Sequence, residues 1–266
     1  MVQKNILVSI LVNNYNNQKF LKKSINSCLT QTYKNIEIVV FDDNSTDNSK
    51  KIIKIIKNKK LKKILSSKKK HNPSISLNQF NTIRQSFLKS KGEIIFLLDS
   101  DDYFKKNKIE EVLKIYKKDN HINFVQDLPS ISLKKKIEII DKNNIFSFWP
   151  YLAPESCISF KKNFFINFKK QNKRIENDFK DVWLGFRLGV FAYFKEKSFY
   201  SLKKNLTIYK SYGESKKYAF FGYNWFNRRS NSFNYLKKIK GNVNNLNLNF
   251  DYIFTKLILL TLKFFK

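Results

Sequence analysis

The chain of 266 residues has little glycine, proline or cysteine. With only six Gly and four Pro, it is not collagen-like and is unlike low-complexity disordered chains. Its two cysteines, Cys28 and Cys157, are too far apart to form a metal or redox motif. They indicate free thiols in a reducing compartment. No basic-then-apolar leader precedes the apolar run at residues 6–12, so we expect a cytoplasmic protein without a secretory signal.

Arginine is also scarce, although the net charge is +31. Five of the 52 basic residues are Arg and the others are Lys. Nucleic-acid readers favour Arg because its guanidinium makes bidentate contacts. Lys, Asn, Ile, Phe and Tyr are abundant together, as an AT-biased coding sequence would produce. We therefore expect no specific nucleic-acid partner, although the charge favours anionic surfaces in general.

Apolar runs and helical patterns alternate along the first hundred residues. The hydrophobic fraction of 42% is enough for a substantial core. The expected strands are at residues 6–12, 36–41, 61–65 and 94–98. Helical spacing of apolar residues lies between them, at residues 19–30, 52–56 and 77–87. This alternation predicts an α/β fold with a mainly parallel central sheet and helices on both faces.

The second half of the chain is less regular. Short apolar runs predict strands at residues 122–125 and 156–160, and helical spacing appears at residues 181–191, 216–239 and 252–265. We expect one domain over residues 1–212 and a helical C-terminal extension over residues 213–266.

Polar side chains follow three of the expected strands. They are Asn13–Asn16, Asp42 with Asp43, and Asp99–Asp102. Ligands of parallel sheets bind outside the carboxyl ends of the strands, so these groups should meet at one edge.

The acidic group is the most informative, because neighbouring buried carboxylates repel one another. Asp99 and Asp101 offer the hard oxygen ligands that Mg²⁺ and Mn²⁺ prefer. The same residues are also typical of an acidic turn that caps a helix.

Four motifs resemble the family 2 glycosyltransferases of the GT-A fold (Rossmann-like). They are VSILVNNYN at residues 8–16, QTYKNIEI at 31–38, DDNSTD at 42–47, and GE followed by DSDD between 92 and 102. The resemblance is close over residues 5–104 and continues more weakly to about residue 210. It implies a nucleotide-sugar half at residues 1–104 and an acceptor half at residues 105–212.

The resemblance also implies a chemistry. The donor would be a nucleotide-diphospho-sugar, by default a UDP-sugar, with Mn²⁺ or Mg²⁺ as cofactor and inversion at the anomeric carbon. Asp101 would be the main metal ligand, with Asp99 beside the ribose or the metal. Asp43 would accept a hydrogen bond from the base, and Asp42 would support that turn. The remaining donor-binding residues would be Asn13, Tyr15 and Ser100.

The general base carried over from the family is Asp181, because Leu184 and Arg187 follow it at the family's offsets. Lys180 stands where the family has an acidic residue, so Asp178 and Glu176 remain alternatives. The other reading of Asp181 is a helix N-terminal carboxylate bonded to backbone N–H groups.

Three further residues could each have a role in the site or a purely structural role. Arg84 could contact the diphosphate or lie on a solvated helix face. Trp149 and Ser156 fall where an acceptor-side wall is expected, yet core packing is the commoner use of Trp.

The C-terminal segment 252–265 is apolar but too short to span a bilayer. Lys256 and Lys263 would share one helix face, which permits an in-plane helix on an anionic membrane. Packing on the domain or on a partner is the alternative.

We therefore expect an inverting glycosyltransferase that acts on a glycan or lipid-linked acceptor. Its product would be a cell-surface polysaccharide or lipopolysaccharide, made at the inner face of the cell membrane. The rivals are a metal-dependent nucleotidyltransferase and a noncatalytic basic protein that binds nucleic acid or membrane.

Overall fold

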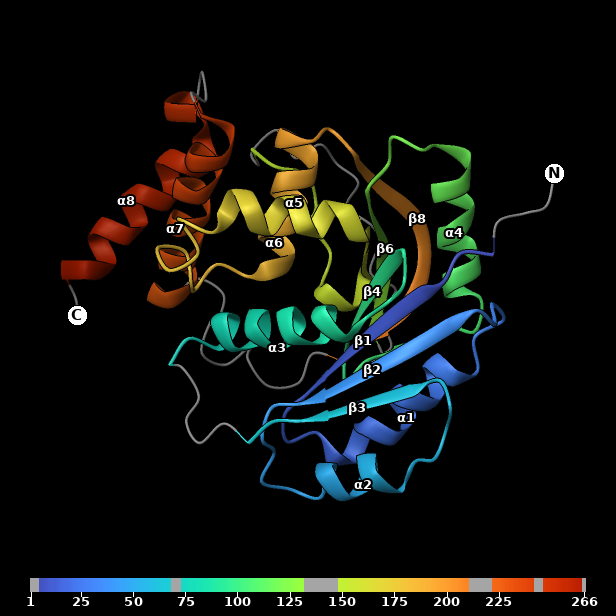
Figure 1. Cartoon of the computed structure of the whole chain (residues 1–266). Coiled ribbons are helices and arrows are strands. Elements are labelled where there is room, and N and C mark those ends of the chain that lie inside the picture. The colour runs from blue at the N-terminus through green and yellow to red at the C-terminus, as the bar shows by residue number, and fades with distance from the viewer. Residues whose placement is uncertain (1–4, 68–72, 132–147, 211–221, 242–245, 265–266) are drawn as a thin grey trace.

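A central sheet of eight strands is the frame of the computed structural model, which describes residues 5–67, 73–131, 148–210, 222–241 and 246–264 (Figure 1). The strand order is β3-β2-β1-β4-β7-β6-β8-β5. The strands are β1 Val8–Asn14, β2 Ile36–Asp42, β3 Leu61–Leu65, β4 Ile94–Asp99, β5 Tyr103–Phe104, β6 Phe124–Ile131, β7 Ile158–Lys161 and β8 Phe199–Tyr209.

Most of the sheet is parallel. Strands β3, β2, β1 and β4 pair in parallel, and β6 pairs in parallel with β8. Strand β7 is antiparallel to both β4 and β6, and β5 is antiparallel to β8. The predicted mainly parallel α/β sheet is therefore confirmed.

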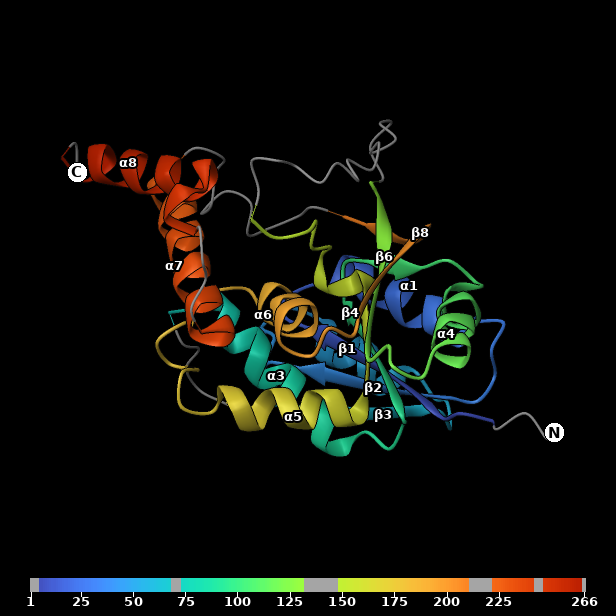
Figure 2. The same ribbon diagram turned by 90° about the horizontal axis from the view of Figure 1, so that it is seen from above.

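Helices cover both faces of the sheet, which appears edge-on in Figure 2. Helices α1 Gln18–Leu29, α2 Ser49–Ile55 and α4 Lys108–Lys118 pack on one face. Helices α3 Ile75–Lys89, α5 Lys162–Asn172 and α6 Leu184–Val190 pack on the other, together with α7 Tyr223–Lys240. Helix α8 Phe250–Phe264 packs on α7, and shorter turns are η1 Glu155–Cys157, η2 Phe191–Lys195 and η4 Leu246–Leu248.

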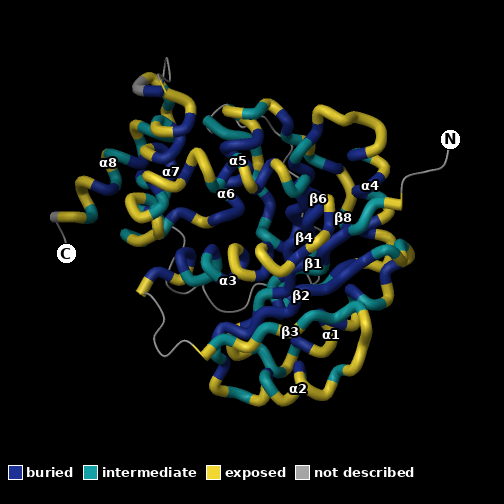
Figure 3. The backbone as a smooth tube through the Cα atoms, in the orientation of Figure 1, coloured by how far each residue is buried: buried dark blue, intermediate teal, exposed yellow. Residues whose placement is uncertain are grey.

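The alternation of side chains along the strands divides the core into two layers. In β1, Ile10 and Val12 join one hydrophobic cluster, and Leu11 between them joins the other. Successive strand residues point to opposite faces, so a strand covered on both sides is apolar throughout. Figure 3 shows the resulting buried strands at the centre, with exposed turns on the surrounding helices.

The structure corrects several sequence-based boundaries in the second half. The helix expected at residues 181–191 begins at Leu184, and the strand expected at residues 122–125 is the longer β6. Sequence analysis missed α4, α5, β5 and β8. The pattern of β8 is obscured because Lys203 and Lys204 are exposed in the middle of the strand.

The C-terminal helices are joined to the core. Tyr235, Leu236 and Ile239 of α7 belong to the same hydrophobic cluster as β1 and β4 residues. Part of the expected helix at residues 216–239 lies outside the described residues, and α7 begins at Tyr223. Among the described residues, none of the helices combines the length and apolar character that crossing a membrane requires.

Candidate active site

The turn after β2 is built around the buried carboxylate of Asp42. Asn14 Nδ2 donates to Asp42 Oδ2 at 2.7 Å, and the Ser45 backbone N–H donates to Asp42 Oδ1 at 2.8 Å. Ser45 Oγ also donates to Oδ2 at 2.7 Å. Asp42 thus holds the turn that presents Asp43, whose backbone N–H donates to Asn14 O at 2.9 Å.

Asn13 lies between the ends of β2 and β4, where Phe41 and Asp99 are its register partners. Its Oδ1 and Nδ2 atoms are buried and have no hydrogen-bond partner among the described residues. Leaving such an amide unsatisfied costs about 1–3 kcal/mol. Asn13 is therefore poised to bind a ligand at this edge, where Tyr15 is 48% exposed.

The acidic turn after β4 is fixed by hydrogen bonds from other segments. Ser100 N–H donates to Asn13 O at 3.0 Å, and Asn17 Nδ2 donates to Ser100 Oγ at 2.9 Å. Asp102 accepts from Ser156 Oγ at 2.6 Å and from the Lys210 backbone N–H at 2.6 Å. Asp102 is buried and holds the turn through both carboxylate oxygens.

The carboxylates of Asp99 and Asp101 have fewer or weaker hydrogen bonds within the protein than that of Asp102. Gln79 Nε2 of α3 donates to Asp99 Oδ1 at 3.2 Å. Asp101 makes no ion pair or side-chain hydrogen bond with another described residue. These two side chains therefore have oxygen atoms available for a ligand.

In the absence of a bound cation, burial and mutual repulsion disfavour the charged forms of the carboxylates in the turn. Burial raises the pKa of Asp99 well above its usual value, and the nearby charges of Glu155 and Asp101 raise it further. Burial raises the pKa of Asp101 to about 6, and burial with the Asp101 charge raises the pKa of Asp102 to about 7. A cation bound here would relieve this repulsion.

No motif in the sequence pointed to Glu155, Gln79 or Lys210. Glu155 opens the turn η1, and its Oε1 accepts a hydrogen bond from Gly185 N–H at 3.0 Å. Lys210 follows β8 and opposes the raised pKa of Asp101 through its charge. Each is an isolated charged or amide residue outside any motif, and only folding brings it to the acidic turn.

The predicted base Asp181 lies in a turn before α6 and not in its first turn. Two serines at the start of α3 hold this turn. Ser74 Oγ donates to Lys180 O at 2.7 Å, and Ser76 Oγ contacts Asp181 O at 3.5 Å. Ser76 and Gln79 are three residues apart and share one face of α3. The same helix face therefore contacts both the Asp181 backbone and Asp99.

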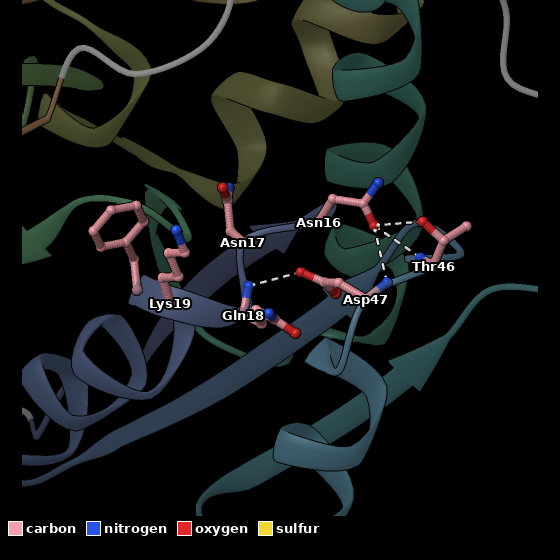
Figure 4. A pocket seen from close by; sticks show the side chains of 7 residues that line it. Asn16, Asn17, Gln18, Lys19, Thr46 and Asp47 are labelled. Carbon is pink, nitrogen blue, oxygen red and sulfur yellow. Dashed lines mark hydrogen bonds between the residues drawn. The ribbon is translucent and has the colours of Figure 1, made fainter.

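A pocket of about 510 Å³ lies between the start of α1 and the turn that follows β2 (Figure 4). It is lined by Asn16, Asn17, Gln18, Lys19, Phe20, Thr46 and Asp47. Asn17 joins it to the acidic turn through Ser100, and Lys210 Nζ lies 4.4 Å from the centroid of the Phe20 ring. The pocket thus has mostly polar walls and is connected to the acidic turn through Asn17.

The structure places Arg84, Trp149 and Ser156, for each of which the sequence allowed two roles. Arg84 is exposed on α3. Trp149 packs between Phe186 and Phe233, with ring centroids 4.9 and 4.5 Å away. Ser156 is fully buried, so it cannot form an acceptor-side wall as expected. It supports the acidic turn, because Asp99 N–H donates to its Oγ at 3.0 Å and that Oγ donates to Asp102.

Behind Ser156 lies a fully buried ion pair. Lys108 Nζ is 2.6 Å from Asp127 Oδ1 and donates to Ser156 O at 2.7 Å. It also donates to Thr207 Oγ1 at 2.5 Å. The pairing of β6 with β8 is irregular around Asp127, as at a bulge that redirects a side chain. The pair ties α4, β6 and β8 to the backbone beneath the acidic turn.

We expect Lys108→Met to lower the free energy of unfolding by about 3–5 kcal/mol, because it leaves the Asp127 charge buried without its partner. Urea denaturation measures this loss. The double variant Lys108→Met with Asp127→Leu should recover most of it. Lys114→Met removes a 61% exposed lysine from the same helix and should leave the free energy of unfolding nearly unchanged. Equal losses in the two single variants would contradict the role given to the buried pair.

None of the described residues forms a group of three or more His, Cys, Asp or Glu side chains that could hold a metal ion alone. Asp101 and Asp99 nevertheless offer the hard oxygen atoms that fit Mn²⁺ or Mg²⁺. Mg²⁺ is usually held by one or two carboxylates together with substrate phosphates.

The chain is similar in sequence to known proteins. The model of the family described as glycosyl transferase family 2 matches residues 9–203. A Nostoc sp. protein named an uncharacterized glycosyltransferase is 30% identical over 139 residues, which cover 52% of this chain and 38% of that protein. A Campylobacter jejuni GalNAc(5)-diNAcBac-PP-undecaprenol beta-1,3-glucosyltransferase is 27% identical over 223 residues, covering 76% of this chain and 64% of that protein.

Solved structures show the same fold at low sequence identity. TarS 1–349 from S. aureus, in complex with UDP-GlcNAc, has a TM-score of 0.62 at 16% identity and covers 97% of this chain and 72% of its own. The mannosyltransferase PcManGT from Pyrobaculum calidifontis, in complex with GDP-Man and Mn²⁺, has a TM-score of 0.64 at 12% identity, with coverages of 97% and 73%.

The family assignment rests on the extent of the match. The chain spans about two fifths of the length of several curated glycosyltransferases that it matches. The match to the family model reaches from β1 into β8 and so includes the acidic turn and the Asp181 turn. This chain belongs to glycosyl transferase family 2.

Proposed function

We propose that the protein transfers a sugar with inversion from a nucleotide-diphospho-sugar to a glycan or lipid-linked acceptor, in a metal-assisted reaction. The observation that carries this is the unpartnered amide of Asn13 beside carboxylates of raised pKa at one sheet edge. Such an edge suits a nucleotide and a cation together.

A UDP-sugar is the default donor. TarS structures contain UDP or UDP-GlcNAc, whereas PcManGT contains GDP-Man. In this proposal Asn13, Tyr15 and Asp43 contact the base, and Asp42 supports their turn. Ser100 and Asp99 border the ribose and diphosphate, with Arg84 as a further candidate for the diphosphate.

Asp101, with Asp99, would hold Mn²⁺ or Mg²⁺. When bound, the cation neutralises charge on the diphosphate leaving group. Asp102 and Asp42 are unsuited as ligands because their oxygen atoms already accept hydrogen bonds within the fold. The positive charge of Lys210 also acts on Asp101 and lowers its pKa.

Asp181 would act as the general base. Its carboxylate accepts the proton of the acceptor hydroxyl as that oxygen attacks the anomeric carbon and the bond to the diphosphate breaks. The C. jejuni relative is named for an undecaprenol-linked acceptor, which supports a lipid-linked glycan here. The product would be a cell-surface polysaccharide or lipopolysaccharide, made on the cytoplasmic side. Residues 250–266 would contact an anionic membrane.

The proposal is tested by thermal shift with a panel of nucleotide sugars in the presence of Mn²⁺. We expect a UDP-sugar to raise the melting temperature at about pH 7.5, because a ligand that binds only the folded state stabilises it. The shift should shrink as the pH falls through about 6, since Asp101, whose pKa is raised to about 6, then holds a proton and loses its ligand oxygen.

The protein without ligand should respond to pH in the opposite sense in this region. Asp101 and Asp102 bind protons more tightly in the folded state than in the unfolded state. Their contribution to stability is therefore present below about pH 4 and is lost as the pH rises through about 6 to 7. No stabilisation by any nucleotide sugar at either pH would overturn the proposed function.

A further inference from the structure

The outward face of α8 carries exposed apolar side chains from Phe250 to Leu260. Ile253, Leu257 and Leu260 are 41%, 57% and 55% exposed, and they recur at the spacing of one helix face. Phe250 and Leu248, at the start of the helix and just before it, are 60% and 79% exposed. We call these five residues the α8 stripe.

The opposite face of α8 is used for packing. Thr255 and Leu259 are buried, and Phe254 contacts Phe226 of α7 with ring centroids 6.1 Å apart. Figures 1 and 2 both show α8 at one end of the molecule, outside α7 and away from the sheet. The stripe therefore faces away from the rest of the described chain.

Positive charge borders the stripe. Lys256 and Lys263 are seven residues apart and lie along one edge of it. Helix α7, which packs on α8, adds Lys237, whose Nζ donates to Tyr252 Oη at 3.0 Å. Because the net charge is +31, two copies of the chain would repel each other, whereas an anionic surface would attract both the helix and the domain.

We propose that the α8 stripe is a docking surface for an anionic phospholipid membrane, with the helix lying in the plane of the interface. An apolar face with lysines at its edge is the pattern of interfacial helices. Apolar side chains would enter the acyl boundary, and the lysines would stay at the headgroups.

Helix α7 connects this surface to the Asp181 turn. On one side, Arg229 Nε donates to Asp251 Oδ1 at 2.7 Å and Lys237 Nζ donates to Tyr252 Oη at 3.0 Å. On the other, the Arg228 guanidinium lies 4.2 Å from the Trp183 ring centroid. A docked α8 would hold the turn close to the membrane, where a lipid-linked acceptor would lie. This consequence rests on the proposed function.

The test is co-sedimentation with vesicles. One variant carries Ile253→Glu, Leu257→Glu and Leu260→Glu. The matched control carries Ile55→Glu, Leu88→Glu and Ile166→Glu, which are also exposed but lie on α2, α3 and α5. Both lose three apolar side chains and gain three carboxylates, so their net charges are equal.

We expect the wild-type chain to bind vesicles of phosphatidylcholine with phosphatidylglycerol and to bind pure phosphatidylcholine weakly. The stripe variant should lose about tenfold or more of this binding, because it removes the apolar area that enters the membrane. The control should bind nearly as well as the wild type. Leu257→Glu alone, with a smaller loss, guards against a folding defect in the triple variant.

Equal binding by the wild type and the stripe variant, or equal losses in the stripe variant and the control, would overturn the proposal. So would a stripe variant that converts a dimer to a monomer in analytical ultracentrifugation without changing vesicle binding. UDP and Mn²⁺ thermal shifts on the same preparations separate the two proposals. If UDP and Mn²⁺ did not raise the melting temperature of the wild-type chain, that result would count against the proposed function and not against the membrane proposal.

Discussion

Asp101→Ala should abolish the Mn²⁺-dependent binding of the donor while leaving the protein folded. The Asp101 carboxylate makes no ion pair or hydrogen bond with another described side chain, so its removal breaks no such contact within the described fold. Asp102 cannot replace it, because both Asp102 carboxylate oxygens accept hydrogen bonds, from Ser156 and Lys210. We expect donor affinity to fall on the order of 100-fold, about 2.7 kcal/mol, in calorimetric titrations with UDP and Mn²⁺.

The ligand-free melting temperature provides a second readout. Removing one of several mutually repelling carboxylates should leave the melting temperature unchanged or raise it slightly at about pH 7.5. Glu110→Ala is a suitable control, because Glu110 is exposed on α4 and, among the described residues, accepts a hydrogen bond only from Thr32 Oγ1, at 2.8 Å. If the variant bound UDP and Mn²⁺ like the wild type, Asp101 would not be the main ligand and Asp99 would take its place.

Asp181→Asn should leave donor binding intact and lower transfer by about 10²–10⁴-fold, the usual contribution of a general base. The amide has nearly the same shape as the carboxylate, and the contact from Ser76 is to the backbone oxygen of residue 181. The turn should therefore keep its conformation, while the side chain can no longer take a proton. Initial rates with the best donor of the panel, measured beside UDP affinity, separate turnover from binding.

Variants of two other carboxylates test whether Asp181 or another residue is the base. Asp178→Asn changes an exposed residue three positions earlier and should have little effect on turnover. Glu155→Gln changes the carboxylate that contacts Gly185 N–H and raises the pKa of Asp99. An active Asp181→Asn protein beside an inactive Glu155→Gln protein would move the base to Glu155.

The parallel half of the fold could be predicted from local patterns. The runs at β1, β2 and β4 are covered on both faces, so they are apolar throughout and stand out in the sequence. Helices α1 and α3 bury one side, which leaves a regular spacing of apolar residues. The prediction of a mainly parallel sheet followed from these elements.

The second half was harder because its signals are not local. Strand β8 is half-exposed, and Lys203 and Lys204 interrupt its apolar residues. Its direction and neighbours depend on pairing with β6, whose sequence is more than seventy residues away. The turn before α6 is set by Ser74 and Ser76, which are separated from it by over a hundred residues.

By itself, the sequence determined which residues form the strand ends of the parallel sheet and which carboxylates follow them. Consecutive residues at the end of one strand stay together however the rest of the chain folds, so Asp42, Asp43 and Asp99–Asp102 could be identified in advance. Only the tertiary structure decided which of these carboxylates are available to a ligand. That depends on Ser156, Gln79, Glu155 and Lys210, which reach the acidic turn through contacts between distant segments.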